Sequence, residues 1–396
     1  MERGSIAFTV AEPPRTVLCR AGIGFLTVGD APSLPALDPN RSTAWDASTC
    51  ETARVTVDDS LRAFIAGLPK AELHVHHVGS ASPEIVAELA RRHPGRVPTS
   101  IDALCEFMTF RDFDHFIQVY LAVAGLVRTP EDVRTLTYEI GRELASTQNV
   151  RYVELTCTPH TSVQAGIPIE AYSEAIEDAR LAAERDHGIV MRWIYDFNGA
   201  DGIPAADATL SYALGHRVPG LVGFGIGGPE VGVPRPQFER QFAAARASGL
   251  RSVPHAGETT GPETVWDAIR VLGAERIGHG TQTVHDPALV RYLVDHQIPV
   301  EACPTSNLAT RAVASLEEHP LPALVEAGVL VTINSDDPPM FGTTLNREYE
   351  VAADLLGLDR EGLARLAVAG VSASFLEDDG KARLIAEIEA YAETSV

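Results

Sequence analysis

The sequence predicts an α/β fold, a (β/α)₈ TIM-type barrel with extra helices and an N-terminal extension. Eight strand-like segments alternate with helix-like segments, a pattern typical of a parallel sheet, and eight strands close such a barrel. Histidines and acids lie at the ends of several of these strands, where barrels of this kind place their functional groups. An open doubly wound sheet is the competing prediction, but no G-x-G-x-x-G motif follows the first strand.

The first 55 residues differ in composition from the rest of the chain. They show no sustained hydrophobic period and contain several prolines, namely Pro13, Pro14, Pro32, Pro35 and Pro39. We expect an irregular N-terminal extension over residues 1–55 and a single barrel domain over residues 56–396. The length of 396 residues suits one large barrel.

The predicted elements begin with a helix that starts after Asp58 and Asp59 and ends near Gly67. The strand predictions cover residues 72–76, 150–157, 189–196, 221–226, 251–254, 276–278, 298–302 and 329–334. Thr129 and Pro130 form an N-cap signal for the helix that precedes the second strand. Apolar residues at helical spacing cover residues 169–184, 237–247, 263–272, 287–295 and 320–327, and further helices are expected from Leu345 onward.

The segment between the first two strands, about 77–149, is too long for one connecting helix, so we expect an added helical lid. A cluster of aromatic residues in it fits either an apolar entrance or a plain helical core; its members are Phe107, Phe110, Phe113 and Phe116.

Composition excludes several classes of partner. The formal charge of −22 repels phosphate backbones and anionic lipid, so we expect neither a nucleic acid nor a membrane partner. Five dispersed cysteines without a C-x-x-C pair favour a reducing cytoplasm over a disulfide framework. No run reaches the roughly 18–20 apolar residues of a membrane span, and Arg20 interrupts the nearest signal-like stretch. Nothing in the sequence indicates an oligomeric state.

Two histidines lie on the first predicted strand. His74 and His76 have i, i+2 spacing, so both rings face the same side of the strand and can hold one metal ion. A pair of hydrogen-bonded core histidines fits the same spacing about equally well, because H-x-H is a weak motif. His77 faces the other side, and we do not expect it to be a ligand.

Two further motifs follow the fifth and sixth strands. His255 offers a third nitrogen, and the turn through Gly257 brings Glu258 towards it, where an apolar wall would keep its carboxyl protonated as a general acid. A helix-start charge is the ordinary alternative for Glu258. His279 lies between two glycines that permit close backbone approach, although in isolation it is no more than a loop histidine.

The eighth strand ends in two adjacent acids, Asp336 and Asp337. Adjacent like charges at a strand end are costly unless a cation or donor is near, although an Asp-Pro pair also fits a solvated turn. Three histidines and a carboxylate form an N/O ligand set suited to zinc with an open position for water. Taken together, the four strand ends predict metal-assisted hydrolysis.

From about Leu68 to Glu350 the chain resembles the adenosine deaminase family of metal-dependent hydrolases. The resemblance rests on ordered blocks, L-P-K-A-E-L-H-V-H, V-R-Y-V-E-L, H-A-G-E, R-I-G-H-G, E-A-C-P-T-S-N, H-P and T-I-N-S-D-D-P-P-M-F. It implies a (β/α)₈ barrel with one zinc at its mouth and a small-molecule nucleoside as substrate. It also implies the metal ligands His74, His76, His255 and Asp336.

The resemblance further implies how a 6-aminopurine is bound and deaminated. Glu258 would protonate N1, and His279 would activate or orient the attacking water. Asp337 would hydrogen-bond N7, and the backbone of Gly228 would meet N3. Ammonia would leave, with the 6-oxo purine as the other product.

The chain departs from the family pattern beside the first histidines. The family usually has H-x-H-L-D-G, whereas here Val78 stands where the aspartate would bind a ribose 5′-hydroxyl. The H-H-V-G-S run resembles the aminodeoxyfutalosine deaminase branch of bacterial menaquinone synthesis, whose substrates carry a benzoate-containing 5′ extension. Arg111 and Arg128 are candidates to meet such a carboxylate. The alternative is that Val78 only shifts affinity and adenosine or 2′-deoxyadenosine remains the substrate.

Two other classes of function remain open. A non-catalytic relative would bind nucleoside or metal, but it would need no combination of Glu258, His279 and Asp337. A barrel hydrolase of cyclic amides often bridges two metals through a modified lysine, and the only lysines here are Lys70 and Lys381, away from the middle strands.

Overall fold

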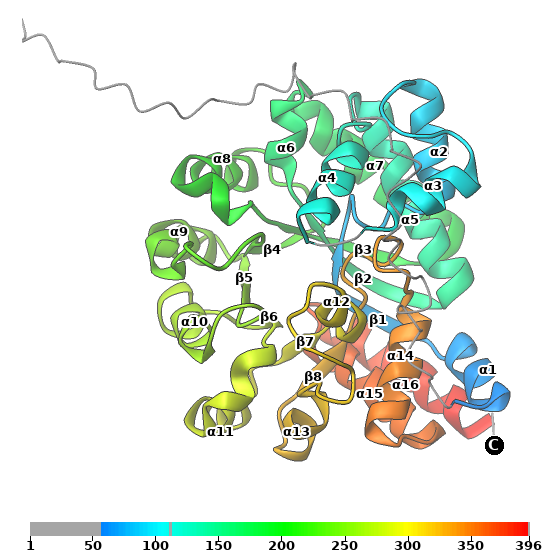
Figure 1. Cartoon of the computed structure of the whole chain (residues 1–396), viewed down its shortest axis with the longest axis vertical. Coiled ribbons are helices and arrows are strands. Elements are labelled where there is room, and N and C mark those ends of the chain that lie inside the picture. Colours follow the sequence, from blue (N-terminus) through cyan, green and yellow to red (C-terminus); the bar gives the residue numbers. More distant parts are fainter. Residues whose placement is uncertain (1–56, 111–112, 395–396) are drawn as a thin grey trace, which may run out of the picture. The chain divides into compact units, whose positions relative to one another are not determined.

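The computed structural model describes residues 57–110 and 113–394, and in them eight parallel strands follow one another in sequence order (Figure 1). Each strand pairs in parallel with the next one along the chain, from the first to the eighth. The predicted barrel is confirmed, with strands β1 (Lys70–His76), β2 (Val150–Cys157), β3 (Val190–Tyr195), β4 (Leu221–Ile226), β5 (Arg251–Ala256), β6 (Ile277–His279), β7 (Val300–Ala302) and β8 (Val331–Ile333).

The seam between β8 and β1 is closed by residues that lie just past the end of β8. Val75 and Asp336 form an isolated parallel bridge. The backbone N–H of His76 donates to the carbonyl of Asp336 at 2.9 Å, and the N–H of Asp336 donates to the carbonyl of His74 at 3.1 Å. Barrel closure therefore fixes the first and last predicted ligand segments against each other.

Helices surround the strands in Figure 1, and α15 packs against both β1 and β8, the strands on either side of the seam. The helices are α1 (Asp59–Gly67), α2 (Pro83–Arg92), α3 (Ile101–Met108), α4 (Phe113–Ala124), α5 (Pro130–Gln148), α6 (Pro159–Gln164), α7 (Ile169–His187), α8 (Gly202–Gly215), α9 (Glu239–Ala247), α10 (Pro262–Asp267), α11 (Pro287–His296), α12 (Pro304–Ala309), α13 (Leu321–Glu326), α14 (Leu345–Leu356), α15 (Arg360–Ala373) and α16 (Asp378–Thr394). The helix predicted over residues 263–272 is α10 followed by a π-helical stretch. It ends where Gly273 turns left-handed and the N–H of Ala274 donates back to the carbonyl of Ala268.

Local sequence explains why α5 begins where it does. Thr129 accepts a hydrogen bond from the N–H of Asp132 at 3.2 Å, and the Asp132 carboxylate accepts one from the N–H of Thr129 at 2.9 Å. Pro130 occupies the first turn, where no N–H is needed. This reciprocal capping box stabilises a helix start by about 1 kcal/mol, and it confirms the predicted N-cap.

The long connection between β1 and β2 contains α2, α3, α4 and α5, as the predicted helical insertion requires. Its Phe116 ring stacks on Phe341 with centroids 5.1 Å apart, and Phe110 lies 5.2 Å from Phe116. Phe341 belongs to the segment after β8, so these aromatic rings join the insertion to the loop that carries Asp336 and Asp337. Residues 1–55, Arg111 and the side chain of Phe113 lie outside the described part of the chain.

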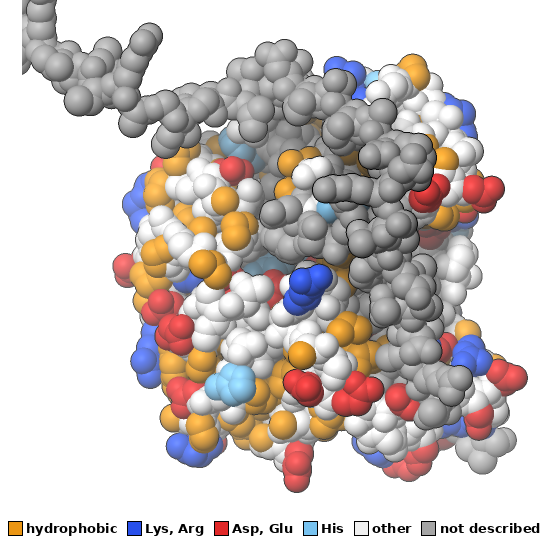
Figure 2. All heavy atoms as spheres, viewed as in Figure 1, with side chains coloured by type: hydrophobic (Ala, Val, Ile, Leu, Met, Phe, Trp, Pro, Cys, Tyr) orange, Lys and Arg blue, Asp and Glu red, His pale blue; other side chains and the backbone are white. Residues whose placement is uncertain are grey.

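Charged and apolar side chains are mixed over the surface of the described residues that Figure 2 presents. Figure 2 shows hydrophobic, acidic and basic side chains interspersed over the described part of the face in view. Within residues 57–110 and 113–394, none of the helices is both long enough and apolar enough to cross a bilayer.

Candidate active site

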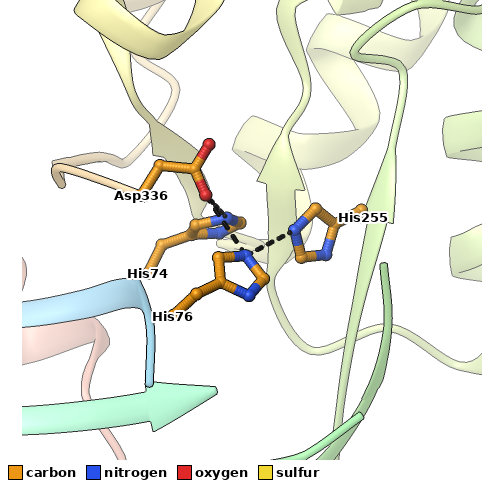
Figure 3. Close-up of side chains that lie close together, drawn as sticks. All are labelled: His74, His76, His255 and Asp336. Atoms are coloured by element: carbon orange, nitrogen blue, oxygen red, sulfur yellow. Dashed lines mark hydrogen bonds and ion pairs between the residues drawn. The ribbon is translucent and has the colours of Figure 1, made fainter. Parts of the chain in front are cut away.

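Four side chains from distant parts of the sequence converge at one end of the barrel (Figure 3). His74 and His76 come from β1, His255 from β5, and Asp336 from the segment after β8. One nitrogen or oxygen of each lies within 4.8 Å of those of the other three. The Nε2 of His76 is 3.3 Å from the Nε2 of His255 and 3.2 Å from Oδ1 of Asp336. The structure thus brings together the four residues predicted as metal ligands.

The chemistry of this cluster fits a metal ion. Nε2 of His74 and Oδ1 of Asp336 are buried and have no hydrogen-bond partner among the described residues, and they lie 3.5 Å apart. Buried polar atoms without partners are costly, and a cation held between them removes that cost. A second possible grouping adds Cys303 to His74 and His279, but burial raises the pKa of the Cys303 thiol well above its usual value and disfavours the thiolate.

A buried carboxylate orients His74. Oε2 of Glu301 lies 2.8 Å from Nδ1 of His74, and Oε1 of Glu301 accepts from Arg276 at 2.5 Å. Burial disfavours an ionised Glu301, but Arg276 and His74 together outweigh it and lower the pKa of Glu301. The ionised carboxylate requires a proton on Nδ1, so Nε2 presents its lone pair to the cluster.

The backbone and one hydroxyl orient Asp336. Its φ of +65° is left-handed, an uncommon conformation for a residue with a side chain. Oδ2 accepts a hydrogen bond from the Ser306 hydroxyl at 2.6 Å, which leaves Oδ1 facing the histidines. Glu301 and Ser306 were not singled out from the sequence, although both lie in the E-A-C-P-T-S-N run.

Glu258 lies beside the cluster, with its carboxyl 3.7 Å from Nε2 of His279 and its side chain 15% exposed. Burial, together with the charges of Asp336 and Glu230, raises the pKa of Glu258 to about 8. The carboxyl is therefore protonated at neutral pH, the state that a general acid requires.

The loop that carries Glu258 is held by Glu230, which sequence reasoning did not single out. The Glu230 carboxylate accepts from the backbone N–H groups of Gly257 at 2.7 Å, Glu258 at 2.9 Å and Thr259 at 2.6 Å. Glu230 is buried after β4, so it ties the end of β4 to the loop after β5. The same charge that positions Glu258 also helps to keep it protonated.

His279 ends β6 with a left-handed backbone, φ +61°. Gly278 precedes it because a Cβ at that position would lie 2.9 Å from Cε1 of His74 and 3.2 Å from Cα of His255. This close approach, which the sequence predicted, places the end of β6 against the ring of His74 and the backbone of His255. Nδ1 of His279 lies 3.1 Å from the amide nitrogen of Asn307, and burial lowers the pKa of His279 to about 3, which keeps the ring neutral.

Asp337 follows Asp336 and is buried with an unpartnered Oδ1. Burial and the adjacent charge of Asp336 raise the pKa of Asp337 to about 7, so a protonated carboxyl that can donate is within reach near neutral pH. Gly79 was not assigned a role from the sequence, yet a Cβ there would overlap the Asp337 carboxylate. A glycine at this position therefore gives Asp337 its room.

The two remaining predicted residues lie at the ends of β4 and β1. Gly228 is exposed with a left-handed φ of +78°, and a Cβ on its neighbour Gly227 would lie 3.7 Å from the His255 ring. Val78 is half-buried and Arg128 is exposed. Val78 lines a small hollow whose other walls are His77, Tyr120, Ala124, Val127, Thr156, Thr158, Thr161, Ser162 and Tyr172.

The chain as a whole is similar to several known proteins. The chain is 62% identical to an aminodeoxyfutalosine deaminase of Streptomyces avermitilis, over 84% of this chain and 93% of the relative. An adenine deaminase structure from Arthrobacter aurescens superposes with a TM-score of 0.78 at 32% identity, over 82% of this chain and 99% of that one. An amidohydrolase structure from Burkholderia ambifaria with bound Zn gives a TM-score of 0.77 at 26% identity, over 86% and 95%.

The adenosine deaminase family matches residues 69–391, which contain every strand of the barrel and all the site residues described in this subsection. The match spans most of the chain and agrees with the resemblance seen in the sequence blocks. The chain therefore belongs to the adenosine deaminase family.

Proposed function

We propose that the chain is a cytoplasmic, zinc-dependent hydrolytic deaminase that converts the 6-amino group of aminodeoxyfutalosine, a 5′-modified adenine nucleoside of menaquinone biosynthesis, to a 6-oxo group. One observation carries the proposal. The cluster of three histidines and Asp336 contains buried atoms without hydrogen-bond partners and lies next to a protonated Glu258. The 62% identity to an aminodeoxyfutalosine deaminase supports the choice of substrate.

His74, His76, His255 and Asp336 would hold one zinc ion, since imidazole nitrogens and a carboxylate oxygen are donor types that zinc prefers in proteins. When bound, the ion supplies Lewis-acid activation of water. The unpaired cysteines Cys157 and Cys303, both buried, are consistent with a reducing compartment.

The remaining residues act on the purine ring and the water. Glu258 donates its proton to N1 as C6 is attacked, so the ring does not accumulate negative charge. Asp337 donates to N7, an acceptor that needs a protonated carboxyl, and the N–H of Gly228 donates to N3. His279 faces Glu258 and Asp336 through Nε2, where it contacts the water oxygen. Ammonia is released from C6.

Val78 supports a substrate without a free 5′-hydroxyl. Valine accepts no hydrogen bond, and it lines a hollow that also contains the hydroxyls of Tyr120 and Thr158. A 5′ extension placed over Val78 would meet this mixed apolar and hydroxyl surface. Adenosine lacks such an extension. Its 5′-hydroxyl would lie against a methyl group of Val78 without a hydrogen-bond partner, which disfavours its binding.

The test compares zinc-loaded enzyme on aminodeoxyfutalosine, 5′-methylthioadenosine, adenosine and 2′-deoxyadenosine. We expect kcat/KM to be highest for aminodeoxyfutalosine. Val78→Asp should move the preference towards adenosine by about 10-fold or more, while the isosteric Val78→Thr, which adds no carboxylate, should not. The highest kcat/KM on adenosine, in an enzyme indifferent to Val78→Asp, would reject the substrate assignment. Activity unchanged by chelation would reject the metal-dependent mechanism.

A further inference from the structure

A chain of buried hydrogen bonds leads from the backbone of α13 to the ring of His279. His319 and Asn307, which form it, have no part in binding metal or purine in the account above. Both side chains are buried, with 4% and 0% exposure. His319 belongs to the H-P motif before α13, and Asn307 lies on α12.

The donor at the outer end of this chain is unambiguous. The backbone N–H of Leu321 lies 3.1 Å from Nδ1 of His319. Because an amide N–H only donates, Nδ1 of His319 must be the unprotonated nitrogen. The proton of a neutral His319 is therefore on Nε2, and burial favours the neutral ring by lowering its pKa to about 4.

The first hydrogen bond fixes which atom donates in each of the hydrogen bonds that follow. Nε2–H of His319 donates to Oδ1 of Asn307 over 3.2 Å. With its oxygen occupied in this way, Asn307 presents its NH₂ group to Nδ1 of His279, 3.1 Å away. Nδ1 of His279 must then accept, so the proton of the neutral ring lies on Nε2.

Nε2 of His279 is the atom that faces the reacting groups. It lies 3.7 Å from Oε2 of Glu258 and 3.9 Å from Oδ2 of Asp336. A ring that arrives with Nε2–H has no lone pair there with which to remove a proton. An imidazolium ring would set its Nδ1–H against the NH₂ of Asn307, which the fixed direction of the chain disfavours.

We propose that Asn307 and His319 are positioning residues that hold His279 as the Nε2–H tautomer, so that His279 donates a hydrogen bond to the reacting oxygen instead of accepting a proton from it. The inference rests on the proposed deaminase function for its catalytic consequence, but the tautomer itself is a property of the folded chain. It decides between the two roles, activating or orienting the water, that the sequence left open for His279.

The direct test is nitrogen NMR of the full-length, zinc-loaded protein labelled with ¹⁵N-histidine. The His279 signals are assigned by their loss in His279→Gln. We expect Nδ1 of His279 to resonate as an unprotonated nitrogen and Nε2 to carry the proton. A protonated Nδ1 with a bare Nε2 in the unaltered protein would overturn the proposal. This measurement needs no substrate, so its result does not depend on whether the proposed function is correct.

Asn307→Asp keeps the shape of the side chain and should reverse the tautomer of His279. A carboxylate at residue 307 still accepts from His319 but also accepts from Nδ1–H of His279, so the tautomer should switch. Forcing the wrong tautomer on a catalytic histidine costs on the order of 10⁴ in kcat in serine proteases, and we expect a loss of about 10²–10⁴ here with KM changed less than about 3-fold. Zinc content should be unchanged, which separates tautomer reversal from loss of the metal centre. A switched tautomer with unaltered kcat would refute the donor role.

Two variants of His319 test whether its hydrogen bond to Asn307 is needed, since one removes the donor and the other restores it. His319→Leu removes the donor to Asn307, so we expect a mixture of His279 tautomers and a fall in kcat of roughly 10-fold. His319→Gln restores an N–H donor and should recover the Nε2–H tautomer and most of the kcat. Equal kcat in the Leu and Gln variants would argue that His319 only fills space.

Discussion

His74 and His279 lie side by side, with ring centroids 4.7 Å apart, yet opposite groups hold their Nδ1 atoms. Glu301, a carboxylate, accepts a hydrogen bond from Nδ1–H of His74, whereas the amide of Asn307 donates a hydrogen bond to Nδ1 of His279. One ring therefore presents a lone pair at Nε2 and the other presents an N–H. Within one pocket, therefore, the hydrogen-bond partner at Nδ1 decides whether an imidazole can be a metal ligand or a hydrogen-bond donor at Nε2.

Substitution of a predicted metal ligand should have the largest effect on activity. Asp336→Asn replaces a charged ligand with a neutral one and places an NH₂ group against His76, so we expect kcat to fall by at least about 10³-fold with loss of bound zinc. Metal analysis beside steady-state kinetics checks this. Retention of both zinc and activity would show that the His₃Asp cluster is not the metal site.

Substitution of Glu258, the proposed general acid, should lower activity without releasing the metal. Glu258→Gln removes the acidic proton while keeping the shape of the side chain, and general acids contribute about 10²–10⁴-fold. The raised pKa of Glu258 means that the active, protonated form predominates below about pH 8 and is lost above it. We expect kcat/KM to decline as pH rises through that range in the unaltered enzyme. In Glu258→Gln the residual activity should lack this decline.

Glu301→Gln tests the comparison between the two rings most specifically. The amide cannot enforce a proton on Nδ1 of His74, and the variant also leaves Arg276 without its charged partner. Losing such an outer partner typically weakens metal binding about 10–100-fold. Zinc competition with a chelator measures the effect. Asn307→Asp is the matched control, because it should lower kcat while leaving zinc affinity as it was; equal zinc affinities in the two variants would remove the distinction.

Gly79→Ala should have the smallest effect of the four. The added methyl group would overlap the Asp337 carboxylate and displace it, so we expect KM for the purine to rise about 10-fold with zinc content unchanged. Steady-state kinetics on the preferred substrate gives the answer. Wild-type kinetics in this variant would imply that Asp337 does not contact the ring.

Much of the barrel and the ligand cluster was predictable because its signals are local. The four ligands lie on or just after three apolar strands, so short motifs such as H-x-H and N-S-D-D-P carried the information. Bounds of β2 and β4 agree with the predicted ones residue by residue. The seam at Asp336 follows from the same placement, since closure brings the eighth strand to the first.

The partners behind the ligands were not predictable, because each meets its target only in three dimensions. Glu301 is 227 residues away from His74 in the sequence, and Glu230 reaches a loop 27–30 residues beyond it. A carboxylate within an apolar strand gives no indication of which ring it will hold. The interpretation of Val78 depends on a missing group, and its consequence for substrate choice stays a prediction.

A competition experiment tests substrate choice and metal dependence at once. Zinc-loaded enzyme is given equal concentrations of aminodeoxyfutalosine and adenosine, and the two 6-oxo products are followed over time, with and without a chelator. We expect aminodeoxyfutalosine to be consumed first and the chelator to stop the reaction until zinc is restored. Preferential consumption of adenosine, or a rate indifferent to the chelator, would contradict it.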